Sequence, residues 1–242
     1  MTISIVVPVH NEAENIQPLL DEIVVALANF NAYEIIYIND GSSDETAQAL
    51  AVAQKNLPQL RVFEHQQSCG QSAAIYTGIK AAKYPFIATL DGDGQNNPAD
   101  IPALFDYLNA QRDVNPKLTM IAGWRNKRHD SAWRLFSSKF ANGIRSRLLG
   151  DATPDTGCGL KVFVRDAALQ LPFFDHYHRF LPALMIRSGY DVISLPVLHR
   201  ARERGVSNYG TLDRLWVGIS DTFGVMWLKT RMKLTEVREI EH

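Results

Sequence analysis

The sequence predicts an α/β protein with a mostly parallel central sheet flanked by helices. Short runs rich in β-branched residues alternate with segments of helical spacing, and polar residues follow directly after several of these runs. The 242 residues, of which 46% are apolar and 21% charged, suit one such domain with a modest appendage. We expect residues 1–210 to form the α/β domain and residues 211–242 an amphipathic helical tail of the same structural unit.

The overall composition argues against several classes of protein. The formal net charge is −1, so there is no electrostatic argument for a nucleic-acid partner. Cys69 and Cys158 have no metal-ligand spacing, and with no signal peptide at the start they are expected to be reduced thiols in the cytoplasm. No window reaches the roughly eighteen charge-poor apolar residues that a membrane-spanning helix requires.

The first predicted strand covers residues 3–9 (ISIVVPV), a β-branched run typical of a central parallel strand buried on both faces. His10, Asn11 and Glu12 follow directly, and apolar residues recur at helical spacing over residues 15–30. A dinucleotide site would need glycines in this first turn, so the sequence argues against a nicotinamide oxidoreductase. Glu12 either faces a site or only complements the dipole of the helix.

Asp40 follows the second predicted strand, residues 33–38, and precedes a helix over residues 44–57. A carboxylate at the end of a strand can accept hydrogen bonds from a ribose or a base. An Asp in a D-G-S turn can also serve only the turn, and both interpretations stay open. A third strand over residues 60–65 and a helix over residues 73–83 come next.

The fourth predicted strand, residues 86–90, ends in Asp91, Gly92 and Asp93, with Gln95 two residues further on. Two carboxylates one residue apart on a tight turn offer hard oxygen ligands to a divalent cation that also holds diphosphate oxygens. An isolated D-x-D is often only a solvated acidic turn. Because α/β sheets bind ligands at the carboxyl ends of their strands, the position favours a metal site.

Cationic residues follow the fifth predicted strand, residues 118–123. Arg125 is the one best placed to clamp a phosphate, although such a group can also be solvated surface. The helix expected over residues 131–149 places Arg134 and Ser138 four residues apart on one face, where a second small anion could be held.

The last predicted strand, residues 191–198, contains Pro196, which favours a position at the edge of the sheet. Before it, residues 151–165 read as a polar loop that passes into a strand, and residues 169–189 look helical with breaks at proline.

The segment after this strand, residues 199–209, alternates Arg200, Arg202 and Arg204 before a glycine and Ser207. Such a cationic loop suits a phosphate ester. The alternative is a solvated charged surface.

Residues 211–234 have the pattern of an amphipathic helix that charged residues interrupt. Its aromatic and basic residues suit a helix lying in the headgroup region of a membrane. They are Trp216, Phe223, Trp227, Lys229, Arg231 and Lys233. Packing on the domain or on a partner helix is the alternative.

Four motifs together resemble the inverting GT-A family 2 glycosyltransferases, specifically the dolichyl- and undecaprenyl-phosphate sugar synthases. The motifs are V-P-V-H-N-E, I-N-D-G-S-S-D, L-D-G-D-G-Q and R-x-R-G-x-S-x-Y. The resemblance implies the GT-A fold and transfer of a sugar from a GDP- or UDP-sugar to a polyprenyl monophosphate. The sequence departs from the family pattern at His10, Asn39 and Asn208. The first two departures concern the contacts to the base, and the third removes one cation near the acceptor.

The resemblance also implies site residues. The donor nucleotide-sugar would meet Pro8, Asn11, Glu12, Asp40, Asp91, Gly92, Asp93, Gln95 and Arg125. Mg²⁺ or Mn²⁺ would be bound by Asp91, Asp93 and Gln95, and Asp91, Asp93 and Arg125 would serve catalysis. The acceptor phosphate would meet Arg134, Ser138, Arg202, Arg204 and Ser207.

A phosphate acceptor simplifies the expected mechanism. With a second pKa of about 6 it is largely dianionic at pH 7 and needs no strong base. Two alternatives remain: a family 2 enzyme that uses a saccharide hydroxyl, with Asp155 as general base, and a nucleotide-sugar-binding protein without turnover. We expect a cytoplasmic protein, peripheral on the inner face of the cell membrane, attached through the tail or a membrane protein partner.

Overall fold

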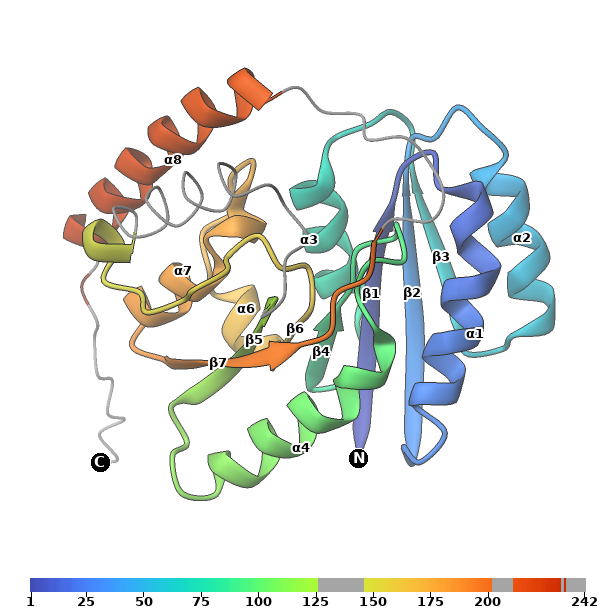
Figure 1. Cartoon of the computed structure of the whole chain (residues 1–242), viewed down its shortest axis with the longest axis horizontal. Coiled ribbons are helices and arrows are strands. Elements are labelled where there is room, and N and C mark those ends of the chain that lie inside the picture. The colour runs from blue at the N-terminus through green and yellow to red at the C-terminus, as the bar shows by residue number, and fades with distance from the viewer. Residues whose placement is uncertain (126–145, 202–210, 232, 234–242) are drawn as a thin grey trace, which may run out of the picture.

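The computed structural model describes residues 1–125, 146–201, 211–231 and 233. Within these residues the strands form one seven-stranded sheet in the order β3-β2-β1-β4-β6-β5-β7 (Figure 1). Neighbouring strands are parallel, except that β6 runs antiparallel to β4 and β5. The strands are β1 (Thr2–Val9), β2 (Ala32–Asp40), β3 (Leu60–His65), β4 (Phe86–Thr89), β5 (Leu118–Arg125), β6 (Lys161–Val164) and β7 (Asp191–Val197). The predicted α/β class with a mostly parallel sheet is confirmed.

Helices cover both faces of the sheet. One buried core joins α1, α2 and α4 to one face, and a second core joins α3, α6, α7 and α8 to the other. The helices are α1 (Ile16–Ala26), α2 (Thr46–Asn56), α3 (Gln71–Ala81), α4 (Ile101–Arg112), α6 (Arg165–Leu169), α7 (Leu181–Arg187) and α8 (Thr211–Arg231). Short 3₁₀ helices cover Ala13–Asn15, Pro98–Asp100 and Tyr177–Arg179.

The apolar strand β1 lies in the interior of the sheet, between β2 and β4. Its residues from Ile3 to Val9 are buried, as the continuous β-branched run predicts for a strand covered on both faces. β7, which contains Pro196, lies at the edge of the sheet, so that prediction is confirmed as well. The carboxyl ends of β1, β2 and β4 meet at one end of the sheet, where polar loops follow each strand.

The structure corrects the expected helix over residues 169–189. A short α6 ends at Leu169, the 3₁₀ helix Tyr177–Arg179 follows, and α7 begins at Leu181. Pro182 lies in the first turn of α7 and does not break it, because the first-turn N–H groups of a helix have no partner within the helix. Most of the helix expected over residues 131–149 lies outside the described residues.

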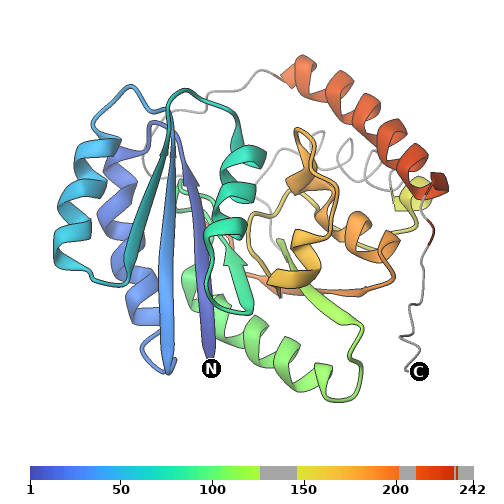
Figure 2. The ribbon, with the colours of Figure 1, turned by 180° about the vertical axis from the view of Figure 1, so that it is seen from behind.

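Helix α8 lies over the half of the molecule that carries α6 and α7, at the end toward which β1 runs (Figures 1 and 2). Val225 is fully buried in the second core, and Arg187 Nε donates a hydrogen bond to the Leu228 carbonyl at 3.0 Å. Among the described residues, no helix combines the length and the hydropathy that crossing a bilayer would take.

Candidate active site

A cavity of about 540 Å³ opens where β1, β2 and β4 end. Almost all residues that the sequence assigns to the donor line it: Pro8, Glu12, Asp40, Asp91, Gly92, Asp93, Gln95 and Arg125. These residues come from four strand ends and their loops, which the parallel pairing of the sheet brings to one edge. Asn11 is the exception.

Asn11 ties together the loops that follow β1 and β2. Its Oδ1 accepts a hydrogen bond from the Ser43 N–H at 2.8 Å, and its own N–H donates to Ser42 Oγ at 3.0 Å. Its φ angle of 56° lies in the left-handed region, which asparagine tolerates better than most residues. Asn11 therefore links the two loops through hydrogen bonds and does not line the cavity.

Asp91 is held in place from two sides. Its Oδ1 accepts a hydrogen bond from Gln71 Nε2 at 2.7 Å, and its N–H donates to Asn96 Oδ1 at 3.0 Å. Gly159 backs the carboxylate so closely that a Cβ atom there would lie 2.2 Å from Asp91 Oδ2. Only glycine at position 159 leaves room for the carboxylate in this position.

The electrostatic environment of Asp91 suits a divalent cation. Burial and then repulsion from Asp93 raise the pKa of Asp91 to about 6, although the cations of Lys161 and Arg125 oppose the rise. Asp93 Oδ1 accepts the Gln95 N–H at 3.1 Å, which fixes the turn. The carboxylate of Asp91, with its raised pKa, and the neighbouring carboxylate of Asp93 fit the hard oxygen donor set that Mg²⁺ or Mn²⁺ prefers.

Lys161 is a buried cation that the sequence analysis did not select. Its side chain, only 3% exposed, lines the cavity, and its Nζ donates a hydrogen bond to the Cys158 carbonyl. Burial lowers its pKa, while the charges of Cys158, Asp91 and Asp155 act in the opposite direction. A single lysine within the apolar run that forms β6 was the available sequence signal.

Arg125, at the end of β5, is fixed by Asp155. Its Nε and Nη2 donate to the two carboxylate oxygens at 2.6 and 2.8 Å, and its N–H donates to Oδ2 at 3.2 Å. This bidentate pair orients the guanidinium at the cavity wall. It also engages both oxygens of the carboxylate that the sequence analysis considered as a general base.

Asp40 anchors the loop that precedes α3. The donors to its carboxylate are the N–H groups of Cys69 (2.9 Å) and Gly70 (2.8 Å), the Ser68 hydroxyl (2.9 Å) and His65 Nδ1 (2.6 Å). Burial alone would raise the pKa of Asp40, but these hydrogen bonds outweigh burial and lower it. Four donors match the four lone pairs of a carboxylate, which favours the turn-forming interpretation of Asp40.

Glu12 retains a position that suits a ligand. Its Oε2 accepts a hydrogen bond from Asn15 Nδ2 at 2.6 Å, and its N–H donates to Thr46 Oγ1 at 2.9 Å. The side chain lines the cavity beside Pro8.

The residues expected to meet the acceptor phosphate, Arg134, Ser138, Arg202, Arg204 and Ser207, lie outside the described residues. Arg200, which the sequence groups with the cationic loop, is described. It forms a bidentate ion pair with Glu22 of α1. That part of the expectation is corrected, because a nearby carboxylate from another element holds Arg200.

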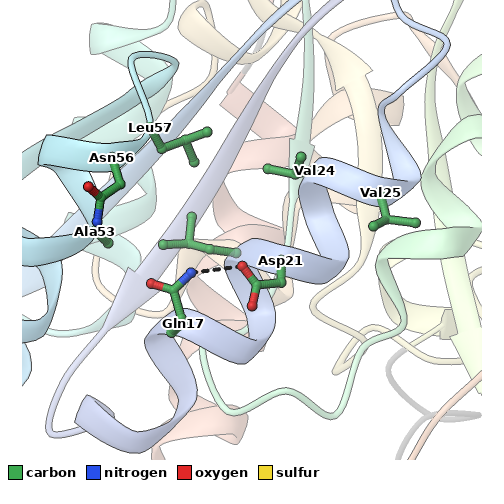
Figure 3. Close-up of a pocket in the computed structure, with 8 residues that line it drawn as sticks. Gln17, Asp21, Val24, Val25, Ala53, Asn56 and Leu57 are labelled. Atoms are coloured by element: carbon green, nitrogen blue, oxygen red, sulfur yellow. Dashed lines mark hydrogen bonds between the residues drawn. The ribbon is translucent and has the colours of Figure 1, made fainter.

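A second groove, of about 320 Å³, lies between α1 and α2 (Figure 3). Among the described residues that line it, Asp21 is the only ionisable one, and its Oδ1 accepts a hydrogen bond from Gln17 Nε2 at 2.7 Å. No group of converging polar residues forms there. The cavity at the strand ends is therefore the candidate active site.

The chain is similar in sequence to a glycosyl transferase family and to curated proteins named as polyprenyl-phosphate sugar synthases or transferases. The Glycosyl transferase family 2 model matches residues 4–171. The dodecaprenyl-phosphate galacturonate synthase of Rhizobium johnstonii is 34% identical over 94% of this chain. An undecaprenyl-phosphate 4-deoxy-4-formamido-L-arabinose transferase of Edwardsiella ictaluri is 33% identical over 87%. The chain spans 67% and 63% of the lengths of these two relatives.

The fold has solved neighbours at low sequence identity. One is glucosyl-3-phosphoglycerate synthase from Mycobacterium tuberculosis, in complex with Mn²⁺, uridine diphosphate and glucosyl-3-phosphoglycerate. It superposes with a TM-score of 0.66 at 19% identity, covering 94% of this chain and 79% of that chain.

Proposed function

The chain belongs to glycosyl transferase family 2, and from that premise we propose that it transfers a sugar from a UDP- or GDP-sugar to a polyprenyl monophosphate. It has the GT-A fold of this family. The observation that carries the proposal is the cavity that gathers Asp91, Asp93 and Arg125 at the strand ends. The dodecaprenyl- and undecaprenyl-phosphate in the names of the relatives support a lipid phosphate as acceptor.

The donor would lie across the strand ends. Asp91 and Asp93, with Gln95 beside them, would hold Mg²⁺ or Mn²⁺, which when bound neutralises the negative charge of the leaving diphosphate. Arg125, fixed by Asp155, adds a positive charge at the cavity wall. Because Asp155 orients the Arg125 side chain before substrate binds, binding costs little further side-chain entropy at this residue.

The acceptor would attack the anomeric carbon as a phosphate. One of its oxygens forms the new bond to that carbon while the bond to the nucleoside diphosphate breaks, so the configuration inverts. A phosphate monoester with a second pKa of about 6 is largely dianionic at pH 7 and supplies the electron pair itself. Residues Arg134, Ser138, Arg202, Arg204 and Ser207 remain our proposal for the acceptor phosphate.

A saccharide hydroxyl as acceptor is the second candidate, and it would require a general base. Asp155 was the sequence-based choice. Both of its carboxylate oxygens are bonded to Arg125, so the acid that could serve as base is already used to position a cation. This contact supports the phosphate acceptor.

Helix α8 would bring the site to the membrane surface. Ile219, Phe223 and Trp227 follow one another at intervals of four residues, and each is an exposed large apolar side chain. Arg231 stacks over the Trp227 ring at 5.8 Å, which adds a cation beside this stripe. The stripe faces away from the buried Val225, as expected of a helix lying in the headgroup region of a membrane. The inner face of the cell membrane is the location that we propose. A membrane protein partner is the alternative occupant.

Lys229, expected to be a cation in the headgroup region, instead contacts the domain. Its Nζ donates a hydrogen bond to the Leu149 carbonyl, so this side chain helps to hold α8 on the domain. Arg231 and Lys233, both exposed, remain the cations proposed for anionic lipid.

The test is transfer from radiolabelled UDP- and GDP-sugars to undecaprenyl phosphate in detergent, with an oligosaccharide acceptor in parallel. We expect lipid-linked product that disappears with EDTA and returns with Mn²⁺ or Mg²⁺. Product only on the oligosaccharide would favour the second candidate. Sugar-nucleotide binding without transfer to either acceptor would indicate a binding protein.

A further inference from the structure

His178 lies in the wall of the candidate active site although it is distant in sequence from the donor motifs. It belongs to the 3₁₀ helix Tyr177–Arg179, which precedes α7. It contacts Ser72, 106 residues earlier, in the first turn of α3. Ser72 follows Gln71, which binds Asp91, so His178 and the carboxylate pair are supported by the same helix start.

Two hydrogen bonds join His178 to Ser72. His178 Nδ1 lies 2.7 Å from Ser72 Oγ, and the His178 N–H donates to the same oxygen at 3.4 Å. Ser72 is 1% exposed, so its hydroxyl proton needs a protein acceptor. The backbone N–H of His178 already donates to Oγ, and an unprotonated Nδ1 at 2.7 Å would accept the hydroxyl proton.

This arrangement selects one tautomer of His178. If Nδ1 accepts from Ser72, the ring proton is on Nε2. Burial, followed by the charges of Arg179, Lys161 and His176, lowers the pKa of His178 well below its ordinary value. The imidazole is thus neutral at pH 7, and Nε2–H is the group that it can offer to a ligand in the cavity.

The position in the sheet indicates which part of the substrate this group would meet. Pro8 and Asp40 lie at the carboxyl ends of β1 and β2, Glu12 follows β1, and Asp91 follows β4, the strand next to β1. A donor laid from β1 and β2 toward β4 places its diphosphate near the carboxylate pair. Its sugar would then lie toward β6, near Lys161 and His178, which both line the cavity and interact electrostatically.

We propose that His178 donates an Nε2–H hydrogen bond to an oxygen of the transferred sugar, with Ser72 as the positioning residue that fixes the tautomer. The inference rests on the proposed function, since it needs a sugar nucleotide in the cavity. It adds a contact that distinguishes a sugar nucleotide from its sugar-free nucleoside diphosphate.

Binding measurements test the contact directly. The probes are UDP-galacturonate, UDP-4-deoxy-4-formamido-L-arabinose and GDP-mannose, each compared with UDP or GDP in the presence of Mn²⁺. His178→Phe should weaken binding of the sugar nucleotide roughly tenfold and leave binding of the nucleoside diphosphate unchanged, as expected for one lost hydrogen bond of about 1.4 kcal/mol. His178→Gln should recover part of the loss, because its amide N–H can replace Nε2–H. His176→Asn is the matched control, since His176 lies outside the cavity lining and pairs with Asp221.

A spectroscopic measurement on the wild-type protein needs no variant. In ¹⁵N-labelled protein the His178 ring should show a protonated Nε2 and an unprotonated Nδ1, and the Nε2 signal should shift with sugar nucleotide but not with nucleoside diphosphate. A protonated Nδ1, or equal weakening of both ligands in His178→Phe, would overturn this inference alone. If no sugar nucleotide binds, the proposed function fails and the inference fails with it.

Discussion

Arg200 holds the carboxylate of Glu22 with both terminal nitrogens, at 2.9 Å from Nη1 to Oε1 and 2.7 Å from Nη2 to Oε2. The pair joins the segment after β7 to α1, 178 residues apart. The same segment is bonded to the turn after β4, where the Arg200 N–H donates to the Gln95 carbonyl at 3.0 Å. The pair therefore braces the turn that carries Asp93.

We predict that Glu22→Gln lowers the turnover number several-fold with little change in stability. The ion pair is more than a third exposed at both side chains, so its loss should cost less than about 1 kcal/mol. Without the ion pair, the turn that carries Asp93 would be held less firmly. A proposed metal ligand that is displaced from its position slows catalysis. Steady-state kinetics and thermal unfolding measure the two effects. Asp21→Asn, one residue earlier on α1, is the control and should retain wild-type kinetics; equal kinetics in both variants would contradict the bracing role.

Gly159→Ala should reduce turnover by about 10²-fold, because an added Cβ would lie 2.2 Å from Asp91 Oδ2 and force the carboxylate to move. Mn²⁺-dependent binding of the donor should fall with it, as isothermal titration can show. Gly224→Ala in α8 is the matched control, since a Cβ there meets no atom within 4 Å. Near-normal activity of Gly159→Ala would mean that the position of Asp91 is not critical.

Asp91→Asn should stabilise the metal-free protein at pH 8 while abolishing metal-dependent donor binding. The folded-state pKa of about 6 lies above the ordinary value of 3.8, so ionisation of Asp91 costs stability, and this cost grows as pH rises from about 4 to above 6. The gain in the free energy of unfolding is at most about 3 kcal/mol. Thermal unfolding with EDTA should show the gain at pH 8 and not at pH 4. An identical gain at both pH values would assign the effect to another cause.

The same pKa predicts how wild-type metal binding depends on pH. Protons and Mn²⁺ compete for Asp91, so the affinity for Mn²⁺ should fall as pH decreases through about 6. Titration with Mn²⁺ from pH 5 to pH 8, followed by electron paramagnetic resonance of the free ion, measures the dependence. A flat profile would place the metal elsewhere.

Trp227→Ala and Phe223→Ala should each weaken sedimentation with anionic liposomes, because both side chains are about 60% exposed on α8. Binding of the wild-type protein should also weaken with salt, since Arg231 and Lys233 would each contribute roughly 1 kcal/mol near an anionic surface. Val25→Ala removes an exposed apolar side chain from α1 and serves as control. If the variants bind liposomes as the wild type does, the stripe on α8 serves a protein partner.

The sequence by itself determined the elements whose signal is local. The β-branched run of β1, the edge position of β7 at Pro196 and the carboxylates that follow β4 could each be identified from neighbouring residues. The grouping of the residues proposed for the donor was also predictable, because parallel strands bring their carboxyl ends to one edge whatever packs around them.

The tertiary structure decided which partner each side chain meets. The carboxylate of Asp40 accepts hydrogen bonds from His65 and from the loop before α3. Asp155 pairs with Arg125, and Arg200 pairs with Glu22. Each partner lies between 25 and 178 residues away in the chain. The close approach of Gly159 to Asp91, and of His178 to Ser72, likewise depends on how distant elements pack. Periodicity reports only the face on which a side chain lies, whereas its hydrogen-bond partner depends on contacts between elements that are far apart in the chain.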